Sequence, residues 1–131
     1  MLRKILAVDD SALIHQMYKL FLSRYKNCKL VSAMNGLEAL DKLGQEEGID
    51  LILLDINMPV MNGLEFLKVL REDPVLQPTP VVVLTTSGDD RDRVEAYRLN
   101  VAGYLIKPVT SVAFFELMSA LDRYWNLVEL P

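Results

Sequence analysis

The sequence predicts one α/β domain in which five parallel strands form a doubly wound sheet with helices on both faces. Short apolar runs alternate with segments of helical periodicity along the 131 residues, and such alternation is typical of parallel sheets covered on both sides. Residues 51–54 and 81–84 are apolar throughout, as strands buried on both faces require. The length suits a single compact domain over residues 1–131.

The first half of the chain supplies three strand–helix units. Strands are expected at residues 5–8, 30–33 and 51–54, and helices at 11–24, from the Asn35-Gly36 turn onward, and at 63–71. Apolar residues at helical spacing mark the faces that should cover the sheet. They are Leu13, Ile14, Met17 and Phe21 in the first helix, Leu37, Leu40 and Leu43 in the second, and Leu64, Leu67 and Leu70 in the third.

The second half predicts strands at 81–84 and 103–106 and helices at 90–99 and 110–125. One apolar stripe of the last helix consists of Phe114, Met118, Leu121 and Trp125, and further apolar residues lie off it, namely Phe115, Leu117 and Tyr124. A helix that covers one face of a sheet needs a single stripe. We therefore expect that the apolar residues off the stripe and the apolar tail 127–131 form a second buried surface, unless the tail packs back on its own domain.

Composition and charge narrow the function class. The net charge of −4 argues against direct binding of nucleic acid, whose phosphates attract basic surfaces. The single cysteine, Cys28, cannot form an internal disulfide, which suits a reducing compartment. No segment approaches the length of a membrane span, and the apolar run before Asp9 is too short for a signal peptide. We expect a soluble, cytoplasmic protein without a membrane partner.

Polar residues follow the carboxyl ends of four expected strands. They are Asp9 and Asp10, Asp55, Thr85 and Lys107. Sites in open parallel sheets form at these ends. Carboxylates that meet there repel one another unless a cation joins them, and Mg²⁺ is a hard cation that prefers oxygen ligands. With an ammonium and a hydroxyl beside them, the carboxylates make a pocket complementary to a phosphoryl group, with Asp55 as its nucleophile.

These residues make the chain resemble the receiver domain of two-component response regulators. The resemblance extends over nearly the whole length of the chain. The resemblance rests on the acidic pair Asp9-Asp10, on Asp55 within the stretch DINMPVMNG, on Thr85, and on Lys107-Pro108. It implies a flavodoxin-like receiver fold with strand order 2-1-3-4-5.

The resemblance also implies a phosphoacceptor and a metal site. Asp55 would accept a phosphoryl group from a histidine kinase or a histidine phosphotransfer protein. Asp10 and Asp55 would ligate Mg²⁺ directly, Asp9 would act through water, and Asn57 would offer its backbone carbonyl.

Three more residues match the family's response to phosphorylation. Lys107 would pair with the phosphate, Thr85 would move to hydrogen-bond it, and Tyr104 would turn inward as the switch aromatic. The Lys107–Pro108 peptide bond is expected to be cis, as the family implies.

The resemblance suggests where signals leave the domain. The face built from residues 90–99, 103–106 and 110–125 corresponds to a common partner or homodimer surface of the family. The tail YWNLVELP resembles single-domain regulators that work with bacterial phytochrome kinases. No output domain is expected, so the domain would act alone on a downstream protein target.

Three other functions fit the sequence less well. A phosphatase that forms an aspartyl-phosphate carries a second aspartate two residues after the nucleophile, where this chain has Asn57. A phosphorylation-independent binding module usually lacks an acidic or basic site residue, and this chain lacks none. A flavin carrier needs a phosphate-cradling loop after the first strand, where Asp9 and Asp10 would repel phosphate. His15 is expected at the surface, with no role.

Overall fold

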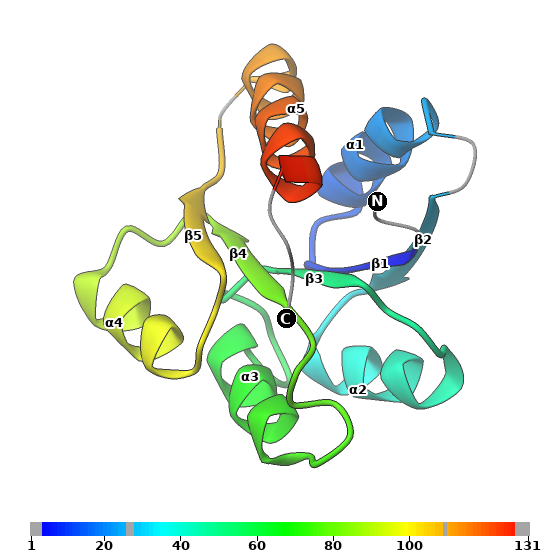
Figure 1. Ribbon diagram of the computed structural model, residues 1–131. Helices are drawn as coiled ribbons and strands as arrows, with labels where there is room; N and C mark the ends of the chain where they lie inside the picture. Colours follow the sequence, from blue (N-terminus) through cyan, green and yellow to red (C-terminus); the bar gives the residue numbers. More distant parts are fainter. Residues whose placement is uncertain (1–3, 26–27, 109, 128–131) are drawn as a thin grey trace.

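The computed structural model describes residues 4–25, 28–108 and 110–127, apart from the side chains of 125–127, and contains a five-stranded sheet (Figure 1). The strands are β1 (Lys4–Val8), β2 (Lys29–Ala33), β3 (Leu51–Leu54), β4 (Val81–Thr85) and β5 (Gly103–Ile106). The helices are α1 (Ala12–Leu22), α2 (Gly36–Gln45), α3 (Gly63–Glu72), α4 (Asp90–Arg98) and α5 (Ser111–Leu127). Every expected element is present, with ends shifted by at most a few residues.

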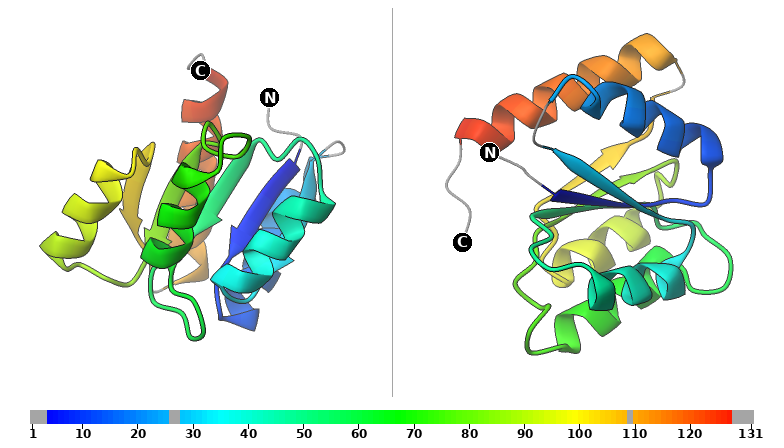
Figure 2. Two further views of the ribbon diagram at one scale, coloured as in Figure 1. Left: turned by 90° about the horizontal axis from the view of Figure 1, so that it is seen from below. Right: turned by 90° about the vertical axis from the view of Figure 1, so that its right-hand side faces the viewer.

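All strand pairs are parallel, in the order β2-β1-β3-β4-β5, which confirms the predicted topology. Helices α1 and α5 cover one face of the sheet, and α2, α3 and α4 cover the other (Figures 1 and 2). Successive strand residues alternate between the two cores, as the two-residue period of a strand requires. Leu6, Val8, Ile52 and Leu54 pack in the core under α2 and α3, whereas Ile5, Ala7, Leu51 and Leu53 pack under α1 and α5.

Two helix faces differ from the prediction. Leu13 is 64% exposed and Leu37 is 48% exposed, so neither faces the sheet. The buried face of α1 includes Tyr18 and Phe21. Each residue of a helix is rotated by about 100° from the one before it, so Leu13 lies to the side of that face. In α2 the small residue Ala39 lies fully buried and takes the inward position that Leu37 was expected to fill.

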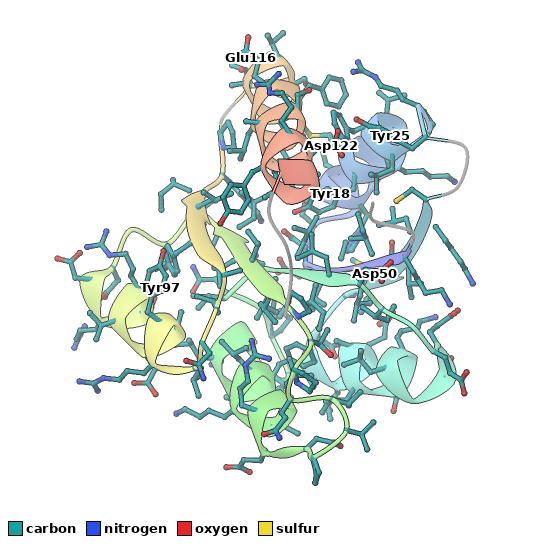
Figure 3. The ribbon with its side chains drawn as sticks, in the orientation of Figure 1. Tyr18, Tyr25, Asp50, Tyr97, Glu116 and Asp122 are labelled. Atoms are coloured by element: carbon teal, nitrogen blue, oxygen red, sulfur yellow. The ribbon has the colours of Figure 1, made fainter. Side chains whose placement is uncertain are left out.

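The surplus apolar residues of α5 are largely accounted for within the domain. Phe114 and Met118 are buried, and Phe115, Leu117 and Leu121 pack beside them. The ring centroids of Tyr18 in α1 and Phe114 in α5 lie 5.3 Å apart. In the loop after α1, the Tyr25 hydroxyl donates to Asp122 of α5 at 2.9 Å (Figure 3). The expectations for the Trp125 side chain and the tail beyond Leu127 lie outside the described residues. No helix in the described ranges is long and apolar enough to cross a membrane.

Candidate functional site

The predicted site residues lie at the carboxyl edge of the sheet. Register pairs Val8 with Leu54, so Asp9 and Asp55, which follow β1 and β3, come level with each other. Leu54 is paired in turn with Val83 of β4, and Thr85 is the last residue of that strand. Asp9, Asp55 and Thr85 are at most 4% exposed and are the buried polar residues of the described chain. Burying charged groups costs free energy unless they are paired, which points to a site that is held together by its own partners.

The acidic loop after β1 is tied down on three sides. The Asp9 N–H donates to the carbonyl of Ala33 at 3.1 Å, and the Asp9 carboxylate accepts from the Ser11 N–H at 2.9 Å. Ser11, rather than either aspartate, caps α1 by accepting from the Ile14 N–H. The Nε2 atom of His15 lies 2.7 Å from the Asp9 carbonyl oxygen. That oxygen can only accept, so Nε2 carries the proton.

The loop from β3 to α3 folds back over the backbone of Asp55. The Gly63 N–H donates to the Ile56 carbonyl at 2.9 Å, and a Cβ on Gly63 would lie 2.2 Å from the Asp55 carbonyl oxygen. Only glycine permits that approach. Asn62 begins α3 with a capping box shared with Glu65, so the Asn-Gly pair both starts the helix and fixes the phosphoacceptor candidate.

Three carboxylates converge at this edge. Asp9, Asp10 and Asp55 each place an oxygen within 4.8 Å of the others. The Lys107 ammonium lies 2.5 Å from Asp9 Oδ2 and 3.2 Å from Asp55 Oδ2, and its side chain is 9% exposed. One ammonium balances one of the three carboxylates, so two negative charges remain uncompensated.

This donor set fits a hard divalent cation. Carboxylate and carbonyl oxygens are the ligands that Mg²⁺ and Ca²⁺ prefer, and three carboxylates meet here around one ammonium. Burial raises the pKa of the Asp9 carboxyl above its ordinary value of 3.8, and the Lys107 ammonium and the Ser11 N–H offset this only in part. A cavity of about 390 Å³, lined by Asp10 and Asn57 among others, opens beside the cluster.

The hydroxyl of Thr85 takes part in a hydrogen-bond network with the loop that follows β4. It accepts from the Ser87 N–H at 3.2 Å, and the Ser87 hydroxyl donates to Asp92 at 2.7 Å. The Tyr104 hydroxyl donates to the Ser87 carbonyl at 2.9 Å. Burial of the half-buried Tyr104 ring raises the pKa of its phenol above the ordinary value of 10. The roles expected for Thr85 and Tyr104 stay predictions, since one arrangement cannot display a switch.

The structure therefore brings Asp9, Asp10, Asp55 and Lys107 together and places Thr85 at the edge of their site. No peptide bond between described residues is cis, so the expectation of a cis bond before Pro108 is wrong. The trans form is the lower in energy for such bonds. Sequence reasoning missed the contact of His15, because the apolar periodicity of a helix does not indicate a hydrogen bond to a carbonyl six residues earlier.

Sequence reasoning also missed the partnership of Ser87 with Asp92. Both residues lie in or after a loop whose path no periodicity specifies. The one local signal is the acidic first turn of α4, which helix dipoles favour in general and which does not single out Asp92.

Comparisons with known proteins agree with this geometry. Residues 5–119 match the family model of the response regulator receiver domain. A chemotaxis protein CheY homolog of Campylobacter jejuni is 35% identical over 107 residues, which are 82% of each chain. The structure resembles that of the phosphorylated cyanobacterial phytochrome response regulator RcpA, with a TM-score of 0.91, 31% identity and coverage of 100% of this chain and 99% of that chain. The Mn²⁺-bound form of the response regulator Rcp1 superposes with a TM-score of 0.88 at 31% identity, over 98% of this chain and 99% of that one.

Proposed function

We propose a phosphorylation switch centred on Asp55 for this chain, which belongs to the response regulator receiver family. Receivers are signalling switches phosphorylated on an aspartate, not conventional enzymes, and they work with histidine kinases. The observation that carries the assignment is the position of Asp55. It is buried at the end of β3, with Lys107 at 3.2 Å and two further carboxylates within 4.8 Å.

The proposed reaction is transfer of a phosphoryl group from a phosphohistidine or a small acyl phosphate. An Asp55 carboxylate oxygen attacks phosphorus, the bond from phosphorus to the donor breaks, and the donor leaves with that electron pair. Lys107 is placed to pair with the incoming phosphoryl oxygens, since its ammonium already contacts Asp55. Thr85 then donates its hydroxyl to the same group.

Charge makes this reaction dependent on a divalent cation. Asp10, Asp55 and the Asn57 carbonyl are the proposed direct ligands of Mg²⁺, and Asp9 is proposed to bind it through water. When bound, Mg²⁺ supplies the positive charge that lets a phosphoryl group enter an acidic pocket. Without a cation, the two uncompensated carboxylate charges would repel the donor.

We propose that the domain acts alone, in the cytoplasm, through a protein surface. RcpA, which this chain covers almost completely, supports a single domain over residues 1–131. The face formed by α4, β5 and α5 carries exposed apolar side chains suited to a downstream target or a second copy of the chain. They are Val94, Tyr97, Ile106 and Val112.

Intact mass spectrometry tests the acceptor. Wild type incubated with Mg²⁺ and acetyl phosphate should gain one phosphoryl group, and the gain should vanish in Asp55→Asn and with a chelator. Asp41→Asn, an exposed change on α2, is the matched control and should be phosphorylated as wild type is. A folded wild type that gains no phosphoryl group and binds no beryllofluoride with Mg²⁺ would favour a phosphorylation-independent binding module instead.

A further inference from the structure

Ser87 joins three elements through its three polar groups. Its N–H donates to the Thr85 hydroxyl at the end of β4, and its own hydroxyl donates to Asp92 in the first turn of α4. Its carbonyl accepts from Tyr104 of β5. Every movement of the Thr85 hydroxyl must therefore be transmitted to, or absorbed by, the residue that holds α4 and Tyr104.

We propose that the Ser87–Asp92 hydrogen bond is a latch that holds α4 in the resting arrangement and opens when Asp55 is phosphorylated. The latch is the bond from Ser87 Oγ to Asp92 Oδ2, at 2.7 Å. The inference rests on the proposed function of Asp55, and it assigns Ser87 and Asp92 as positioning residues for the switch.

Helix capping does not explain the bond. Asp89 is the N-cap of α4 and accepts from the Arg91 N–H at 2.8 Å. Asp90, in the same turn as Asp92, points to solvent with 80% of its side chain exposed and pairs with Arg93. Asp92 instead lies half-buried and lines the cavity that also contains Asp10. Its carboxylate is thus turned from solvent toward the acidic site.

Two physical effects open the latch in the same direction. A Thr85 hydroxyl that turns to donate to a phosphoryl group draws its oxygen away from the Ser87 N–H, and the Ser87 backbone must follow or lose that bond. If the Ser87 backbone follows, the hydrogen bond from its hydroxyl to Asp92 becomes longer, because Asp92 is part of α4. Hydrogen bonds weaken steeply as their distance and angle depart from the ideal. A phosphoryl group also adds negative charge to the cavity that Asp92 lines, which disfavours a carboxylate there.

A latch that exists only in the resting arrangement shifts the equilibrium between the two arrangements. Removing it should therefore favour the phosphorylated arrangement before any phosphoryl group arrives. One hydrogen bond of ordinary net strength corresponds to a change of about two- to tenfold in that equilibrium. The expected effect is a tightening of that size in apparent affinity for a phosphoryl mimic.

The test is titration of the full chain with beryllofluoride in the presence of Mg²⁺, followed by fluorine and amide NMR. Ser87→Ala and Asp92→Ala should each tighten binding about two- to tenfold. The double variant should add little to either single change, because both remove the same bond. Ser87→Thr keeps the hydroxyl and should return the affinity toward wild type. Asp90→Ala removes the same charge from the same helical turn and should leave the affinity unchanged.

The amide spectrum of free Ser87→Ala supplies a second readout. Its α4 and β5 signals should move part of the way toward the positions of the beryllofluoride-bound wild type. If Ser87 had only a structural role, the α4 and β5 signals would change without moving toward the beryllofluoride-bound positions. Tightening by Asp92→Ala alone, with Ser87→Ala equal to wild type, would show a pure charge effect and overturn the latch.

Failure of the latch and failure of the proposed function give different results. Wild type that binds beryllofluoride while both single variants bind with unchanged affinity overturns the latch alone. Wild type that binds none, or Asp55→Asn that binds as well as wild type does, overturns the proposed function and the latch together.

Discussion

Asp55 depends on a glycine eight residues later in the chain. A Cβ on Gly63 would lie 2.2 Å from the Asp55 carbonyl oxygen and 2.8 Å from the Ile56 Cα, and backbone atoms cannot step aside as a flexible side chain can. Gly63→Ala should therefore lower the free energy of unfolding by about 3 kcal/mol, measured by urea denaturation.

The matched control for Gly63 lies on α2. A Cβ on Gly44 would meet nothing within 4 Å, so Gly44→Ala should raise stability by up to about 1 kcal/mol through helix propensity. Equal losses in the two variants would mean that the close approach at Gly63 is relaxed in solution.

Val60 carries backbone strain beside the site. Its φ is 69° and its side chain is 74% exposed, so a β-branched residue adopts the left-handed region without packing to compensate. Val60→Asn should raise the free energy of unfolding by about 1 kcal/mol, because asparagine tolerates that region. Thermal denaturation is the measurement, and a lowered midpoint would show that the valine makes a stabilising contact after all.

At the residue scale, the sequence predicts the site residues that lie at the ends of strands. Asp9, Asp55 and Lys107 were predicted to meet because parallel strands bring their carboxyl ends to one edge, and they do meet. The bonds of His15 and Asp92 were not predicted. Each depends on the path of a loop and the rotamer of a side chain, which neither periodicity nor composition specifies.

At the element scale, Arg71 connects α3 to two neighbouring loops. Its guanidinium donates to four carbonyl oxygens, those of Gln77, Thr79, Leu99 and Asn100. These carbonyls belong to the segment before β4 and the segment between α4 and β5. Arg71 thus fixes the C-terminal end of α4, and the latch residues lie at its opposite end.

Replacing Arg71 should separate these elements. Arg71→Met should cost about 2 kcal/mol of unfolding free energy, because the partly buried carbonyls of Leu99 and Thr79 lose a charged donor, and amide exchange should quicken around Leu99 and Asn100. Lys68→Met is the control from the same helix. Its ammonium lies 3.8 Å from Glu95 in an exposed ion pair, and such pairs contribute at most about 1 kcal/mol. Comparable losses in the two variants would mean that the four hydrogen bonds of Arg71 do not hold α3 to α4.

Helical periodicity located all five helices, yet it did not fix their rotation. Leu13 and Leu37 were expected inside and lie outside, whereas Tyr18 and Ala39 are buried. Size and apolarity favoured the leucines. The structure instead buries a phenol, whose ring packs on Phe114, and a methyl group where α2 comes close to the sheet.

At the scale of the whole molecule, the acidic cluster couples stability to pH and to cations. Burial raises the pKa of Asp9 above 3.8 in the folded chain, so the folded state holds that proton more tightly than the unfolded state does. The contribution of Asp9 to stability is therefore fully present below about pH 4 and is lost as the pH rises through the raised pKa.

Asp9→Asn tests this coupling. Without divalent cations, the difference in unfolding free energy between Asp9→Asn and wild type should grow in favour of the variant from about pH 4 upward, because the amide carries no charge to bury. Asp41→Asn, exposed on α2, should show no such trend. A difference that stays flat with pH would mean that Lys107 compensates the buried carboxylate completely.

Cations should reverse the order of the two proteins at neutral pH. A ligand that binds only the folded state stabilises it by about 2.7 kcal/mol at a hundred times its Kd, and wild type retains all three carboxylates for that ligand. Melting curves with and without Mg²⁺ should therefore show a larger gain for wild type than for Asp9→Asn. Equal gains would place the cation away from Asp9. In that case the Asp9 carboxylate, whose charge weakens the cation-free fold, would have no part in preparing the site for a phosphoryl group.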